Sequence, residues 1–192
     1  MAAPPSDQQT NPSERARRLQ RVRRVSAAMA RACVVVAVLL TLAMAIYWWT
    51  TPVDGLYRQA GVPGVSSPDL DPLFRLGGFA ISMIPLAALI YGLLAARRCF
   101  KALSAGRIFS RETSLSLRTF AIAVAASALL KLPVGAALSV FLSLAAPTPT
   151  RSLVLAVDSE TLLSLLFAAM VAVIAWVLSE ATDIADENQQ FV

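Results

Sequence analysis

The chain contains no histidine, which removes the side chain most often used as a general base, a proton shuttle or a transition-metal ligand. Cysteine is scarce as well: Cys33 and Cys99 are the only two, and they form no CxxC pair. We therefore expect neither a zinc site nor a disulfide framework, and we interpret both thiols as small apolar groups in the interior or at an interface. Neither a metal site nor a cofactor site is predicted, and the protein is not expected to be an enzyme.

Charged residues are also few, at 15% of the chain, against about 25% in an average soluble domain. Hydrophobic residues make up 57% of the 192 residues, more than a water-soluble core of this size can enclose. A lipid bilayer is the alternative solvent for such a surface. The composition therefore predicts a small integral membrane protein.

Four apolar stretches are each long enough to cross a hydrocarbon core, which takes about 20 helical residues. None of them alternates apolar and polar residues as barrel strands do, so helices are predicted. The predicted class is an all-α polytopic membrane protein with four transmembrane helices in a small bundle. The predicted spans are residues 32–50, 76–96, 119–145 and 161–179.

The segments between these spans differ in basic charge, and this difference predicts the orientation. Residues 1–31 hold seven arginines and the connector 97–118 holds six basic residues, whereas the connectors 51–75 and 146–160 together hold three. Basic segments near membrane spans stay on the cytoplasmic side. Four crossings then place both chain termini in the cytoplasm.

The residues before the first span form two segments of different composition. Residues 1–13 contain three prolines and no apolar pattern, so we expect a disordered tail. Residues 14–31 carry the arginines and predict a basic cytoplasmic helix that runs directly into the four-helix transmembrane domain at 32–192. The expected partner of this helix is a bilayer with anionic headgroups; alternatively, the arginines only fix the orientation. No nucleic acid is expected, because no aromatic residue accompanies the arginines.

The connector 51–75 contains four prolines and three glycines, a composition that excludes long regular structure. One short interfacial helix is predicted within it, over Asp54–Ala60, with Asp54 as its N-cap. The remainder is interpreted as a surface loop without catalytic groupings.

The connector 97–118 contains a turn that is a candidate cytoplasmic motif, made of Gly106, Phe109 and Ser110. Gly106 supplies the backbone freedom to stop one helix, and Ser110 is placed to cap the next. Phe109 is expected to dip into the headgroup boundary or to pack beneath the bundle.

This turn, the pair Leu117-Arg118 and the C-terminal residues 185–192 resemble the bacterial membrane proteins of domain-of-unknown-function family 2975. The resemblance covers about residues 30–192 and leaves the basic arm outside. It implies four helices and a bacterial inner membrane, and it implies no activity.

Lys131 is the one charged residue inside the predicted spans, and it is the candidate intramembrane polar site. It lies near the middle of 119–145, where a charge costs about 2.5–3.5 kcal/mol on insertion scales. Ionisable groups at such a depth are candidates for function, with Asp158, Glu160 or a neighbouring chain as partner. The structural alternative is a long tilted helix broken at Pro133, in which Lys131 caps a freed carbonyl or reaches an interface.

The predicted function is a non-enzymatic regulatory or scaffolding subunit that acts through contacts with an unknown protein partner. The alternative is a small oligomeric transporter or channel that uses Lys131 for an anion or a proton. A third interpretation, in which Lys131 activates Ser127 as a nucleophile, has no accompanying motif. Small residues at four-residue spacing, Ala88/Gly92/Ala96 and Gly135/Ser139/Ser143, fit bundle packing and a homo-oligomer equally well.

Overall fold

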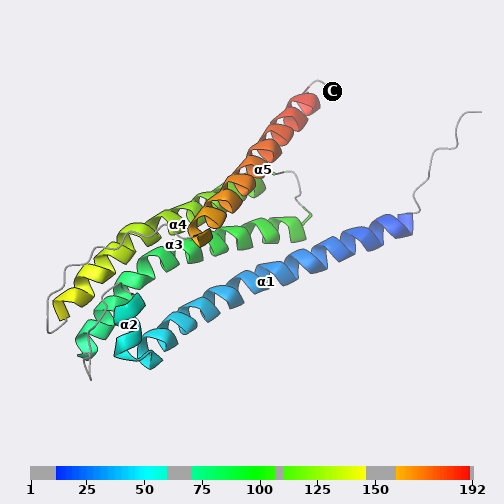
Figure 1. Cartoon of the computed structure of the whole chain (residues 1–192). Helices are drawn as coiled ribbons and strands as arrows, with labels where there is room; N and C mark the ends of the chain where they lie inside the picture. The colour runs from blue at the N-terminus through cyan, green and yellow to red at the C-terminus, as the bar shows by residue number, and fades with distance from the viewer. Residues whose placement is uncertain (1–11, 60–70, 107–109, 146–158, 191–192) are drawn as a thin grey trace, which may run out of the picture.

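The computed structural model describes residues 12–59, 71–106, 110–145 and 159–190, and all regular structure in these ranges is α-helical (Figure 1). Four of the helices are long and apolar enough to cross a membrane. The predicted all-α architecture with four candidate transmembrane helices is therefore confirmed. The helices are α1 (Pro12–Thr50), α2 (Val53–Gln59), α3 (Pro72–Ser104), α4 (Arg111–Ala145) and α5 (Ser159–Gln190), of which α2 is the short one.

Each long helix extends beyond the apolar segment predicted within it. α1 is unbroken from Pro12, so the basic segment 14–31 continues into the first span as predicted. The expected tail at 1–13 lies almost entirely outside the described residues. The short helix of the connector 51–75 begins at Val53, because the carbonyl of Pro52 accepts its first N–H bonds. Asp54 therefore lies in the first turn of α2 and is not its N-cap, which corrects the prediction.

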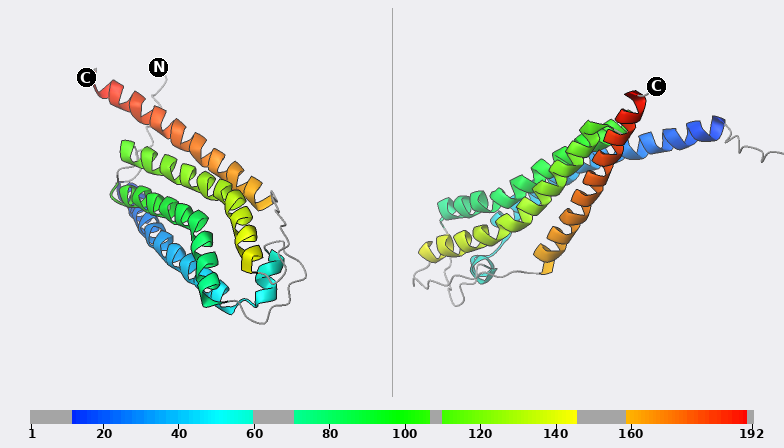
Figure 2. Two further views of the ribbon diagram at one scale, coloured as in Figure 1. Left: turned by 90° about the vertical axis from the view of Figure 1, so that its left-hand side faces the viewer. Right: turned by 90° about the horizontal axis from the view of Figure 1, so that it is seen from above.

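The four long helices pack as a row in chain order. α1 contacts α3, α3 contacts α4 and α4 contacts α5, and no other pair of described helices makes extensive contact. In Figure 2 the row forms a curved layer with α1 and α5 at its two edges. The predicted bundle is thus an open one, in which the two outer helices do not close against each other.

The α3–α4 interface depends on small residues. Gly92 lies so close to α4 that a Cβ atom added there would stand 3.0 Å from the Cβ of Ala123. On α4, Ser139 and Ser143 are buried, whereas Gly135 faces open space. The small-residue pattern of α4 therefore marks its packing face only from Ser139 onward. Small residues allow the close backbone approach on which helix association in lipid relies.

α3 and α4 both curve part-way along their length, as the left view of Figure 2 shows. Each has one internal proline, Pro85 in α3 and Pro133 in α4, and proline removes one helical hydrogen bond. At the internal proline of α3, the hydroxyl of Ser127 on α4 donates to the carbonyl oxygen of Pro85 at 2.8 Å. This bond ties the two bent helices together.

We call the end of the molecule that contains α2 the far end. There, aromatic rings pack against glycines. The ring of Trp48 on α1 lies directly over Gly78 of α3, and the ring of Phe141 on α4 lies over the adjacent Gly77. A Cβ atom at either glycine would collide with the ring that covers it. These two neighbouring glycines let α3 hold α1 on one side and α4 on the other.

α2 closes the far end. Its Val53 and Tyr57 form a small core with Leu142 of α4, and Phe74 and Leu138 pack against it. The guanidinium of Arg75 donates to the carbonyl oxygen of Trp48 at 2.9 Å and so satisfies the C-terminal end of α1. The far end is therefore fixed by contacts from α1, α2, α3 and α4.

Candidate functional site

Lys131 forms an ion pair that links α4 to α5. Its Nζ atom lies 2.7 Å from Oε1 of Glu160, in the first turn of α5. Glu160 is one of the two carboxylates that the sequence offered as partners. Both side chains are on the surface, with exposed fractions of 40% and 72%. The charge of Lys131 is thus compensated within the chain.

The ion pair joins the middle of one helix to the beginning of another. Lys131 lies near the middle of the apolar part of α4, but it is level with the beginning of α5. α4 then runs on to Ala145, about 20 Å further at the helical rise per residue. α4 therefore extends well past the level at which α5 begins.

Ser127 and Lys131 engage different helices. The hydroxyl of Ser127 donates to α3 at Pro85, while the ammonium of Lys131 contacts Glu160 of α5. Each group thus has a partner other than the one that the nucleophile interpretation requires.

The turn between α3 and α4 has the predicted caps. Gly106 adopts φ +85°, a conformation that favours glycine, and its N–H donates to the carbonyl of Leu103 at 3.0 Å. The hydroxyl of Ser110 accepts from the backbone N–H of Thr113 at 3.3 Å, as an N-cap does. Phe109 lies outside the described residues. Because a Cβ at Gly106 would stand 3.2 Å from Nη2 of Arg23, the basic arm of α1 contacts this turn.

The open row encloses a groove, called the central groove below, between its two edge helices. The groove has a volume of about 540 Å³ and is lined by residues of α1, α3, α4 and α5. Its exposed lining is entirely apolar. Cys33 of α1 and Cys99 of α3 both line it, and both are buried free thiols, as the sequence predicted. The sequence did not predict the groove itself, because all four helices are apolar on most of their circumference.

A second groove, called the α1–α3 groove below, lies on the other side of the α1–α3 contact and has a volume of about 570 Å³. Arg31 of α1 and two cations of α3, Arg97 and Lys101, line it. The sequence analysis assigned these residues to separate basic segments and did not predict that they meet. Arg31 directly precedes one apolar stretch and Arg97 directly follows another, and this placement is the sequence signal that could have indicated their meeting.

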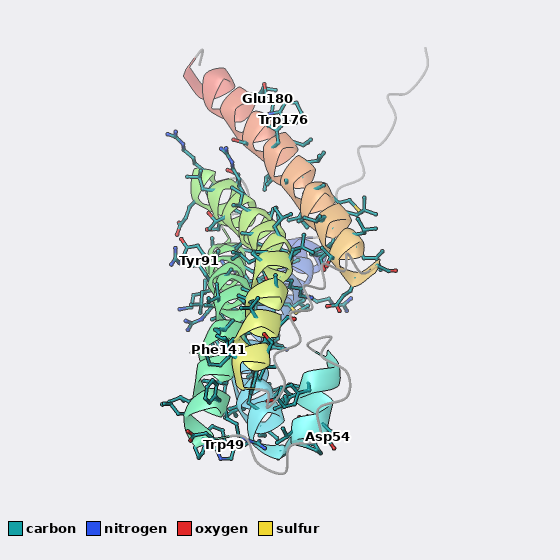
Figure 3. The ribbon with its side chains drawn as sticks, turned by 60° about the vertical axis from the view of Figure 1, so that its left-hand side comes forward. Trp49, Asp54, Tyr91, Phe141, Trp176 and Glu180 are labelled. Carbon is teal, nitrogen blue, oxygen red and sulfur yellow. The ribbon has the colours of Figure 1, made fainter. Side chains whose placement is uncertain are left out.

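Exposed tryptophans stand at two levels of the molecule. Trp49 on α1 is 64% exposed near the far end, and Trp176 on α5 is 70% exposed near the other end (Figure 3). Tryptophan concentrates at membrane–water interfaces.

Over the described residues, no three metal-ligating side chains gather, so nothing in these ranges resembles a metal centre.

Together, the four apolar helices and the exposed tryptophans define a multi-pass helical membrane protein. Residues 57–192 match the family DUF2975, whose description is a protein of unknown function, and the chain belongs to this family. The resemblance stated from the sequence is thus confirmed, although the match begins within α2 and not near residue 30. α1 with its basic arm lies outside the matched region. No match was found among curated proteins or solved structures.

Proposed function

We propose that this protein is a non-enzymatic regulatory or scaffolding subunit, whose central groove receives side chains from a transmembrane helix of a partner protein. The observation that carries the proposal is the open row, which leaves a groove lined by all four long helices. A closed bundle would have filled this space with its own side chains.

The chemistry of the groove favours a helix as its occupant. Its exposed lining offers no polar atom with which to orient a polar ligand. Ala32 and Cys33 of α1 and Ala96 of α3 are small residues of the lining, and small residues allow helices to approach closely in lipid. A volume of about 540 Å³ is too small for a whole helix, so a few inserted side chains are the expected contact.

The proposed orientation has the basic end in the cytoplasm of a bacterial inner membrane. The basic end is the end formed by the beginning of α1, the turn between α3 and α4, and the end of α5 (Figure 2). Basic residues gather there, and positively charged segments next to membrane spans are retained on the cytoplasmic side. Both termini then face the cytoplasm.

Photo-crosslinking from two positions of α1 tests the proposal. A photoreactive residue in place of Val36 lies in the central groove, whereas one in place of Leu39 is similarly exposed but lies outside it. In membranes of the native host, we expect Val36 to give one discrete adduct with another protein and Leu39 to give none. Adducts at both positions, or an adduct only with a second copy of this chain, would contradict the proposal.

A further inference from the structure

The α1–α3 groove gathers three cations from two helices at the basic end. Arg31 of α1 faces Arg97 and Lys101, which lie one turn apart on α3. Within the described residues, none of the three forms an ion pair with a carboxylate. Three like charges that line one groove repel each other, so an anion in the groove would lower their energy.

The depth of these cations corresponds to a membrane boundary. Arg31 directly precedes the apolar stretch of α1, and Arg97 directly follows that of α3. Further along α1, Val34 and Val35 give the groove an apolar wall. The groove thus has a cationic part at headgroup level and an apolar part at the level of the acyl chains.

The α1–α3 groove is separate from the central groove. Helical spacing places Ala32 and Val36, which line the central groove, about 100° around α1 from Arg31 and Val35, which line the α1–α3 groove. Ala30, at the edge of the α1–α3 groove, and Ala37 are both buried. A ligand of one groove therefore does not compete directly with a ligand of the other.

We propose that the α1–α3 groove binds the headgroup of one anionic phospholipid from the leaflet at the basic end. The phosphate contacts Arg31, Arg97 and Lys101, and an acyl chain lies along Val34 and Val35. Basic pockets between transmembrane helices are suited to anionic headgroups. Three cations favour a lipid with two phosphates, such as cardiolipin, over one with a single phosphate. This proposal does not depend on the partner helix of the central groove.

Native mass spectrometry of the purified full chain, released from micelles with added lipid, tests the site. The unmodified protein is expected to retain one cardiolipin, to retain phosphatidylglycerol less well, and to retain no phosphatidylcholine. The double variant Arg97→Gln/Lys101→Gln should lower this retention about tenfold or more, because each cation near a lipid surface contributes to binding. The charge-matched control is Arg98→Gln/Arg111→Gln, which removes two exposed cations that do not line the groove. The control should retain lipid like the unmodified protein.

Three outcomes would overturn the proposal. If both double variants lose lipid retention equally, general surface charge and not the groove binds the lipid. If the unmodified protein retains phosphatidylcholine as well as the anionic lipids, the groove does not recognise headgroup charge. Complete displacement of lipid by inorganic phosphate would indicate a free-phosphate site. If the double variant does not fold, as judged by circular dichroism, Arg31→Gln replaces it with the same expected direction. Failure of the Val36 crosslink leaves this test unaffected, because the grooves lie on different faces of α1.

Discussion

The two ends of the molecule hold their helices together in different ways. At the far end, aromatic rings cover glycines and α2 adds a small core, so the helices of that end are tightly fixed. At the basic end, the helices leave grooves between them, among which one is apolar and another is lined by cations. Under the two proposals above, one end supplies stability and the other presents surfaces for binding.

The largest effect is expected where the far end is most tightly packed. Gly78→Ala should lower the free energy of unfolding by about 1–3 kcal/mol, because the new methyl group collides with the ring of Trp48. Gly135→Ala is the matched control, since nothing lies within 4 Å of its added Cβ. There stability should be unchanged or higher, because alanine favours helices by about 0.5–1 kcal/mol over glycine. Thermal unfolding in detergent measures both, and equal effects would refute the difference.

At the basic end, Gly106→Ala should cost about 1–2 kcal/mol, because an alanine does not readily adopt its positive φ. Gly106→Asn should recover part of this loss, since asparagine tolerates the left-handed region better. The same unfolding assay compares the two. If asparagine and alanine are equally harmful, contact with Arg23 and not the backbone conformation is the cause.

The ion pair between Lys131 and Glu160 should contribute less. A double-mutant cycle of Lys131→Met and Glu160→Gln is expected to give a coupling energy of about 0.2–1 kcal/mol, as for other exposed pairs. The midpoint of thermal unfolding of all four proteins provides the measurement. A coupling energy of several kcal/mol would show that the pair is screened from solvent when the protein is in its membrane or micelle.

The same lysine variant separates the subunit proposal from a transporter. Lys131 lines neither the central groove nor the α1–α3 groove, so we expect Lys131→Met to leave anion and proton flux in liposomes unaltered. A measurable flux that disappears in this variant would favour the transporter.

The smallest effect at neutral pH is expected for Tyr57→Phe. The hydroxyl of Tyr57 is buried without a hydrogen-bond partner, so removing it should be nearly neutral or slightly stabilising. Burial raises the pKa of Tyr57 above its ordinary value, so the unfolded chain loses this proton at lower pH than the folded one. The stability of the unmodified protein should therefore fall as pH rises above about 10. The phenylalanine variant should lose less over the same range; an identical pH dependence would contradict this.

The sequence predicted the parts of the fold that depend on local chemistry. Apolar length identified the four long helices, and the residues Gly106 and Ser110 identified where one ends and the next begins. The sequence did not indicate which helices become neighbours, because a helix that is apolar all round does not show which of its faces is buried. The position of Lys131 relative to α5 was also hidden, since it depends on where α5 begins after its connector and on the bend of α4.

One consequence concerns α1, which is a single helix of 39 residues and about 58 Å long at the usual rise. It has no internal proline, and it touches α3 or its turn at two distant levels, through Arg23 and through Trp48. Such a stiff rod turns as one body. The guanidinium of Arg23 and the indole of Trp48 are therefore held at a fixed separation along one axis, with no flexible joint in between.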